Sequence, residues 1–115
     1  MEWSYQEFKP SKKLGTLIDA YWFYSDFSGT KNNKVLPDGC ADLIFNLGVA
    51  TSKISEETAI VSGMMTRYSV STFKKGTSLL GIRFKPGQLS VITELPLFEI
   101  KNKIIDSKEA LPYIK

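Results

Sequence analysis

The chain has 115 residues, of which 43% are hydrophobic and 12% aromatic, a composition typical of one globular domain and not of a disordered chain. Its net charge of +3 is spread over 15 basic and 12 acidic residues, which indicates solubility and not a nucleic-acid surface. It contains no histidine, which excludes histidine-based metal sites and Ser-His or Cys-His nucleophiles. We expect a single domain, residues 1–115, that is not an enzyme and holds no metal and no cofactor.

The single cysteine, Cys40, cannot form a disulfide within the chain, which fits a reducing compartment. The N-terminal residues show no charged segment followed by an apolar one, and no stretch approaches the roughly 18 apolar residues of a membrane-spanning helix. The sequence therefore predicts a cytoplasmic protein without a membrane partner.

Most of the chain up to Lys85 reads as short strands separated by turn signals. Apolar alternation or aromatic enrichment marks these strands, and they fall at Trp3–Phe8, Ile18–Phe27, within Val35–Gly48, at Thr58–Gly63, at Ser69–Phe73 and at Ser78–Phe84. The polar stretch Ser28–Lys34 and residues 49–58 are interpreted as loops. Short strands at this spacing favour a β-sandwich or a β-barrel.

The character of the chain changes after Pro86-Gly87. Apolar residues at helical spacing predict a short helix over Gln88–Glu94 that Pro96 ends, followed by a turn near Leu97. Asp106 or Ser107 then has the properties of a helix N-cap, with an acidic residue three positions after Asp106. We therefore divide the chain into a β-barrel, residues 1–86, and a short helical segment, residues 87–115, which we expect to lead toward a further domain.

The stretch Val35–Gly48 combines a Pro-Asp-Gly turn with an alternating strand. On that strand Leu43, Phe45 and Leu47 point one way, and Asp42, Ile44 and Asn46 point the other. One hypothesis is that Asp38, Cys40 and Asp42 project together to meet a ligand or a soft metal. The alternative is that Asp38 bonds to its own turn, Asp42 neutralises an arginine and Cys40 fills the core.

Arg83 lies inside the apolar strand that leads into Pro86-Gly87. It shares one strand face with Leu79 and Gly81. A buried guanidinium needs a carboxylate, because leaving it unpaired costs several kcal/mol, and the candidates for this structural ion pair are Asp42 and Asp38. The alternative is that Arg83 clamps an anionic effector bidentately.

Four consecutive aromatic residues, Tyr21 to Tyr24, stand in the second strand. Because a strand alternates, only one pair can face the interior, either Trp22 with Tyr24 or Tyr21 with Phe23. These side chains either pack a filled core or line a pocket. The candidate ligand-binding residues are Trp22, Tyr24, Asp42, Phe45, Tyr68 and Arg83.

Two blocks carry a resemblance to a known family: Leu36-Pro-Asp-Gly-Cys-Ala-Asp-Leu-Ile-Phe-Asn-Leu and Gly81-Ile-Arg-Phe-Lys-Pro-Gly. They resemble the N-terminal sensor domains of AraC-type transcriptional regulators, and Tyr21-Trp22, Pro96-Leu97 and Glu99 stand where that family has similar residues. The resemblance runs from about Leu14 to about Lys115. It implies a cupin-like jelly roll, that is, a double-stranded β-helix barrel, followed by helices.

The same resemblance implies the regulatory half of a DNA-binding protein. We expect an effector-sensing domain that binds an unknown small molecule inside the barrel and forms a homodimer through the C-terminal helical segment. This sequence contains no recognition helix, so DNA would be contacted only through a C-terminal helix-turn-helix domain that it lacks. The alternative is a protein-interaction module with a filled core and no small-molecule ligand.

Overall fold

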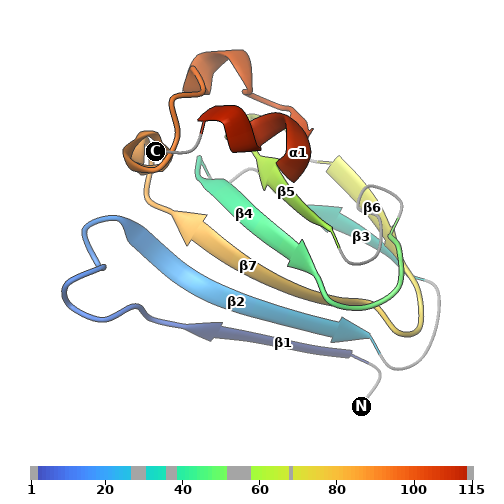
Figure 1. The fold of residues 1–115 in the computed structure, drawn as a ribbon. Helices are drawn as coiled ribbons and strands as arrows, with labels where there is room; N and C mark the ends of the chain where they lie inside the picture. The colour runs from blue at the N-terminus through green and yellow to red at the C-terminus, as the bar shows by residue number, and fades with distance from the viewer. Residues whose placement is uncertain (1–2, 27–30, 36–38, 52–57, 68, 114–115) are drawn as a thin grey trace.

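The computed structural model describes residues 3–26, 31–35, 39–51, 58–67 and 69–113 (Figure 1). It is mostly β, as predicted, with only a few helical turns. The strands are β1 (Trp3–Phe8), β2 (Ile18–Asp26), β3 (Lys31–Val35), β4 (Ala41–Asn46), β5 (Ala59–Ser62), β6 (Ser69–Phe73), β7 (Ser78–Phe84) and β8 (Ile104–Asp106). The helical turns are η1 (Gln88–Val91), η2 (Leu97–Glu99), α1 (Ser107–Ala110) and η3 (Leu111–Tyr113).

Six strands form one antiparallel sheet in the order β1-β2-β7-β4-β5-β8, and β3 pairs with β6 in a second sheet. Strand β7 lies at the centre, between β2 and β4, although it comes late in the chain. The large sheet does not close on itself, because β1 and β8 are its two edges. The β-rich class is thus confirmed, whereas the expected jelly-roll barrel is not.

The six-stranded sheet has two faces with different coverings. One face, which we call the helix face, carries Leu43, Val61, Ile82 and Phe84. The other, which we call the pocket face, carries Trp22, Tyr24, Ile44, Ile60 and Leu79. These sets alternate along each strand, as the sequence pattern predicts.

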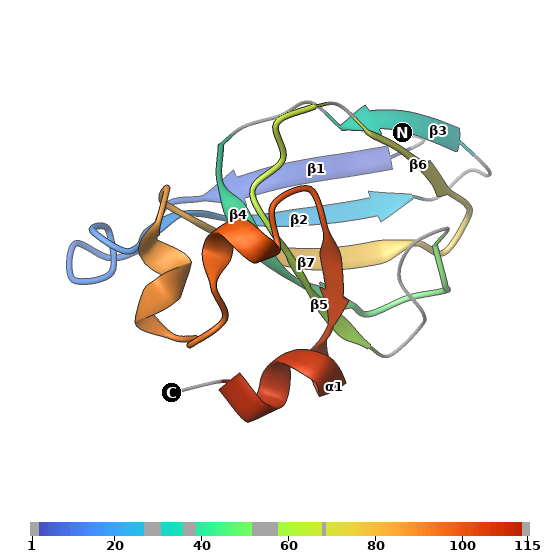
Figure 2. The ribbon, with the colours of Figure 1, turned by 90° about the horizontal axis from the view of Figure 1, so that it is seen from above.

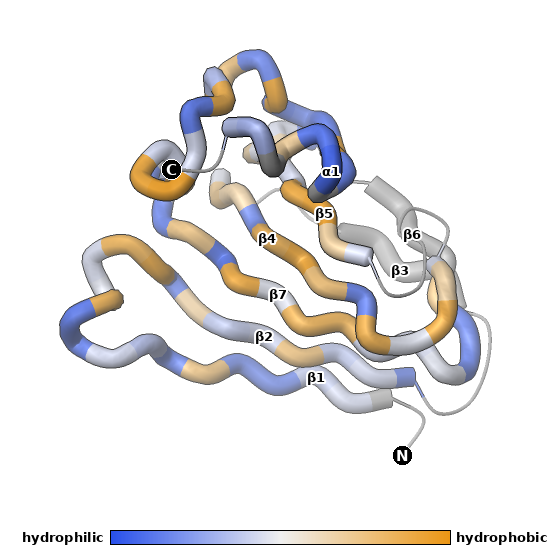
Figure 3. The backbone as a smooth tube through the Cα atoms, in the orientation of Figure 1, coloured by the Kyte–Doolittle hydropathy of each residue, from blue (hydrophilic) through white to orange (hydrophobic). Residues whose placement is uncertain are grey.

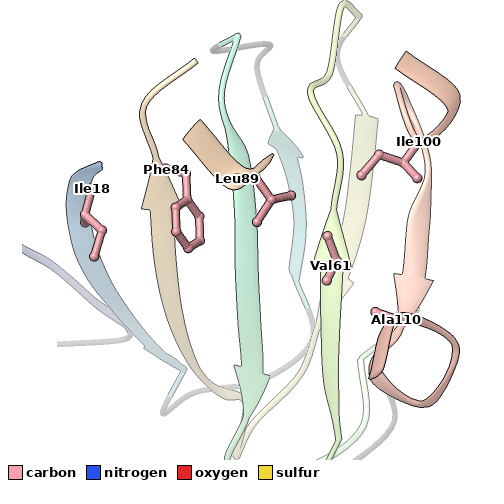
Figure 4. Packing of buried hydrophobic residues seen from close by; sticks show 6 residues of the cluster. All are labelled: Ile18, Val61, Phe84, Leu89, Ile100 and Ala110. Atoms are coloured by element: carbon pink, nitrogen blue, oxygen red, sulfur yellow. The ribbon is translucent and has the colours of Figure 1, made fainter. Parts of the chain in front are cut away.

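The helix face is packed by the chain that follows Gly87. Figure 4 shows the buried cluster, in which each residue is at most 7% exposed: Ile18, Val61, Phe84, Leu89, Ile100 and Ala110. Gly87 begins this covering segment with φ at 78°, a left-handed conformation that glycine adopts without steric cost. Burying each large apolar side chain contributes about 1.5–3 kcal/mol, so this face holds a large share of the core.

The pocket face is covered by the two-stranded sheet β3–β6. Seen from above, β3 and β6 lie on one side of the six-stranded sheet and α1 lies on the other (Figure 2). The contact between the two sheets includes Phe73 of β6, whose ring centroid lies 4.9 Å from that of Tyr24 of β2. The two sheets therefore meet through aromatic side chains.

Strand β3 corrects the sequence interpretation, which placed a polar loop over Ser28–Lys34. Residues Lys31 to Val35 pair with β6 in antiparallel register, from Lys31 opposite Phe73 to Val35 opposite Ser69. The sequence Lys-Asn-Asn-Lys-Val has no apolar alternation, so backbone pairing with β6 makes it a strand where hydrophobic pattern gives no signal.

The C-terminal segment is less helical than the sequence predicts. The helix expected over Gln88–Glu94 is only the short turn η1. Beyond it, Thr93 is buried and its hydroxyl accepts from the amide of Leu95 and donates to the carbonyl of Tyr113. Such local side-chain bonds compete with a helix. The predicted cap is confirmed, since Asp106 Oδ1 accepts from the amide of Lys108 at 2.8 Å.

Hydropathy follows this arrangement. Strands β4, β5 and β7 are hydrophobic over most of their length, with hydrophilic positions on β4 and β7, whereas β1 at the edge is mainly hydrophilic (Figure 3). A mostly hydrophilic edge strand discourages pairing with another chain. Within the described ranges, no helix is long and apolar enough to span a membrane.

Candidate functional site

The pocket face contains a cavity of about 220 Å³. Five strands contribute its lining, which consists of Tyr5 from β1, Trp22 and Tyr24 from β2, Asp42 from β4, Phe73 from β6, and Leu79 and Arg83 from β7. Four of these side chains are aromatic and two are charged. A concave, largely apolar site with a few placed polar groups is the usual form of a small-molecule pocket.

Trp22 lies across the central strand at Gly81, its partner in the β2–β7 register. A Cβ atom at position 81 would overlap the indole ring of Trp22, so only glycine leaves room for this position of the ring. The indole Nε1–H donates to Asp42 Oδ2 at 2.8 Å. Gly81 therefore allows Trp22 on β2 to reach a carboxylate on β4, and the two sequence blocks meet at this point.

Tyr5 and Tyr24 form the aromatic walls beside Trp22. The ring of Tyr5 stacks on the indole with 6.2 Å between centroids and 25° between planes. The hydroxyl of Tyr24 donates to Asp26 Oδ2 at 3.3 Å, and Asp26 is only 2% exposed. This hydrogen bond and the contact with Phe73 hold the ring of Tyr24 in the wall of the cavity.

Arg83 pairs with Glu7 of β1 and with Asp19 of β2. The Arg83 Nε to Asp19 Oδ2 distance is 2.8 Å, and Nη2 bonds Glu7 Oε1. Asp19 is brought to Arg83 by an irregularity in register between Ile18 and Ala20, and a bulge of this kind redirects a side chain. The guanidinium therefore ties the three strands at one side of the sheet.

Burial alone lowers the pKa of Arg83, but the hydrogen bonds to Asp19 and Glu7 outweigh it and raise the pKa above its ordinary value. The predicted need of Arg83 for a carboxylate is met, but by Glu7 and Asp19 and not by Asp42, although Asp42 lies opposite Arg83 in the β4–β7 register. The bulge near Ile18 brings Asp19 to the guanidinium, and Asp42 Oδ2 accepts the indole N–H of Trp22.

The pKa of Tyr5 is also raised. Burial is the largest cause, the negative charge of Glu7 adds to it, and Arg83 opposes it. The neutral phenol is thus the favoured form in the lining of the cavity. Near neutral pH Tyr5 presents a ring and a hydroxyl, not a charge.

Four of the predicted ligand-binding residues line one cavity: Trp22, Tyr24, Asp42 and Arg83. Phe45 does not join them, because it points to the opposite face of β4 and lines a separate cavity of about 490 Å³ with Leu47, Ala59 and Lys108 among others. Tyr68 and Asp38 lie outside the described residues. The open choice within the aromatic run is resolved, since Trp22 and Tyr24 face the cavity.

Two kinds of residue were missed. The first is Tyr5, which lines the cavity opposite Tyr24 in the β1–β2 pairing. Its alternation with Trp3 indicates a strand, but the sequence does not give the register of β1 against β2. Glu7 and Asp19 were missed as partners of Arg83 because one depends on the β1–β2 pairing and the other on the bulge. In the part of the chain that the structure describes, no three His, Cys, Asp or Glu side chains gather as a metal site requires.

A family model described as "Domain of unknown function (DUF6597)" matches residues 6–106, which include every described residue of the cavity except Tyr5. No curated protein matches the chain, and no solved structure does.

Proposed function

We propose that this chain, which belongs to the DUF6597 family, is the effector-sensing domain of an AraC-like transcription regulator and binds a small molecule in the cavity on its pocket face. In this proposal it is a cytoplasmic binding domain and not an enzyme, and its open sheet with the β3–β6 cover is a variant of the cupin-like jelly roll. DNA binding belongs to a C-terminal helix-turn-helix half.

The observation that carries the proposal is the convergence of residues from three other strands, β1, β4 and β7, on Trp22 of β2. Gly81 makes room for the indole, Asp42 orients it, and Tyr5 stacks on it. A core needs apolar contacts but no such oriented indole beside a carboxylate and a guanidinium. Preorganised polar groups around an apolar cavity are what small-molecule recognition uses.

The central strand supplies a route from the ligand to the rest of a regulator. Leu79, Gly81 and Arg83 of β7 face the cavity side, whereas Ile82 and Phe84 face the C-terminal segment. Strand β7 leads through Lys85–Gly87 into η1. In the proposal, a ligand that binds one arrangement of β7 and this segment better than another shifts their populations, and the segment also forms the homodimer contact.

The test is a thermal-shift screen of this chain against a panel of small metabolites, followed by nuclear magnetic resonance of the Trp22 indole N–H. A ligand present at about 100 times its Kd stabilises the folded state by about 2.7 kcal/mol, so a true effector raises the melting temperature. It also displaces the Trp22 signal, which a Trp3→Phe background isolates as the single indole.

Matched variants locate the binding. Trp22→Phe should abolish the shift caused by a hit, while Tyr21→Phe, on the neighbouring residue that packs on the helix face, should keep it. If no metabolite raises the melting temperature or moves the indole signal, the sensing proposal is overturned in favour of an interaction module without a ligand.

A further inference from the structure

The indole of Trp22 lies along the pocket face and crosses the central strand. Its side chain starts on β2, passes over Gly81 of β7, where an added Cβ would fall on ring atoms Cε2, Cζ2 and Nε1, and donates from Nε1 to Asp42 on β4. The side chain thus spans two strand spacings of roughly 4.8 Å each, so the ring lies flat against the sheet and not upright on it. Its outer face is turned to the space between the two sheets, where Phe73 lines the same cavity.

The polar groups beside this ring, within the ranges that the structure describes, are bonded to the protein. The guanidinium of Arg83 is paired with Glu7 and Asp19. The hydroxyl of Tyr24 donates to Asp26, and the indole N–H is also donated within the protein. These side chains therefore present mainly ring surface to a ligand, because the donors named here are used within the protein.

Three further rings line the cavity beside the indole. Tyr5 stacks on Trp22 with 6.2 Å between centroids, and the rings of Tyr24 and Phe73 lie 4.9 Å apart. Leu79, which is 3% exposed, adds an apolar wall. Aromatic rings attract one another when they stack with an offset or meet edge to face at such separations. A flat aromatic ligand on the outer face of the indole would stack on that face and contact the neighbouring rings.

The size of the cavity limits the ligand to a small one. Its volume of about 220 Å³ exceeds the roughly 150 Å³ of an apolar cavity that takes up benzene, and it lies below the usual range for drug-sized ligands. From these observations we propose that the cavity binds a flat aromatic compound of one or two rings, which stacks on the outer face of the Trp22 indole. This inference rests on the proposed function, because it names the ligand class of the same pocket.

The test uses 2-naphthol as the probe and decahydro-2-naphthol as the comparison compound. Both carry a hydroxyl on the same carbon frame and are uncharged near neutral pH, but only the first is flat and aromatic. Binding to the Trp3→Phe protein is followed through the indole N–H signal of Trp22. We expect 2-naphthol to bind saturably and decahydro-2-naphthol to bind about fivefold more weakly, because it makes no contact between aromatic rings.

Tyr5→Leu gives the sharpest variant, because it removes one ring from the lining at a position that is 43% exposed. The preference for 2-naphthol over decahydro-2-naphthol should fall to about twofold, since only the aromatic compound loses a ring contact. A general distortion of the site would instead weaken both compounds equally. Tyr113→Leu is the matched control, because Tyr113 is 45% exposed and does not line the cavity, and it should keep the preference of the parent.

Equal binding of the two compounds, or tighter binding of decahydro-2-naphthol, would overturn the aromatic class while leaving a small-molecule pocket intact. Absence of a response to 2-naphthol overturns it as well, and the metabolite panel then decides the proposed function separately. A panel hit without an aromatic ring preserves the sensor, whereas a panel without any hit rejects both.

Discussion

The two faces of the six-stranded sheet are made by the same strands but are covered in different ways. On the helix face, Leu89, Ile100 and Ala110 fill the space above Phe84 and Val61. On the pocket face, Phe73 of the two-stranded sheet meets Tyr24 and leaves a cavity beside Trp22. The segment that covers a face thus decides whether that face becomes a filled core or leaves a cavity. We expect stability to depend mainly on the helix face and ligand binding on the pocket face.

The largest expected effect is that of Phe84→Ala. Phe84 is buried in the helix-face cluster, and removing such a ring costs about 3–5 kcal/mol of unfolding free energy. Urea denaturation measures the loss. Phe98→Ala is the matched control, because Phe98 is 79% exposed, and its effect should stay within about 0.5 kcal/mol. Similar losses in both variants would contradict the assignment of the core to this face.

Gly81→Ala tests the other face. The added methyl group would overlap the Trp22 indole, and overpacking of this kind costs about 1–3 kcal/mol. The indole should also leave Asp42, which changes the fluorescence of Trp22 and its N–H signal. Gly15→Ala is the control, since a Cβ there meets the carbonyl oxygens of Lys12 and Ser11 at an ordinary 3.5 Å. A Trp22 signal unaltered by Gly81→Ala would refute the role given to this glycine.

Arg83→Gln should have a smaller effect, about 1 kcal/mol. The side chains of Glu7 and Asp19 are 43% and 44% exposed, and solvent weakens such pairs to about 0–1 kcal/mol each. A double-mutant cycle with Asp19→Asn, measured by urea denaturation at low and high salt, should show a coupling that salt reduces. If the Arg83→Gln protein is as stable as the parent, the ion pairs of Arg83 with Glu7 and Asp19 do not stabilise the fold.

The smallest effect concerns pH and Tyr5. Its pKa is raised above 10.0 in the folded protein by burial and by Glu7. The neutral phenol therefore contributes stability that is present below pH 10.0 and is lost as the pH rises through the folded pKa. The fall in unfolding free energy above that pH should be slightly smaller in Tyr5→Phe than in the parent, and an identical fall in both would contradict the shift.

Strands with alternating apolar and polar residues could be predicted from the sequence. Alternation alone predicts the strands that contain Leu43 and Ile82. It also predicts that Asp42 and Phe45 lie on opposite faces of their strand. Strand β3 was not predictable, because Lys31–Val35 is polar and depends on pairing with a distant strand. The order of the strands in the sheet could not be predicted from local sequence patterns either, because it depends on pairings between segments that are far apart in the chain.

Four of the candidate residues from the sequence lie together in the lining of the cavity, whereas the two partners of Arg83 were not among the candidates. Asp42 and Arg83 stood out because charged residues are unusual inside apolar strands. Trp22 and Tyr24 stood out because alternation along four consecutive aromatic residues places one pair on the same face. The hydrogen-bond and ion-pair partners of these residues could not be predicted from the sequence. Whether Arg83 meets Asp42 or Asp19 depends on a one-residue bulge near Ile18, a local backbone choice that no spacing in the sequence encodes.

The position of β7 also has a consequence for the order in which the protein folds. Tyr21 of β2 pairs with Ile82 of β7, so β2 has no inner neighbour until the ribosome has released the chain beyond Phe84. The β1–β2 hairpin is therefore made well before β7 emerges, and closing the loop between β2 and β7 costs entropy before their pairing compensates for it. Non-local pairings of this kind fold on the scale of milliseconds to seconds. Strand β7 is the last in the chain of the strands that line the cavity, and its pairing joins β2 to β4.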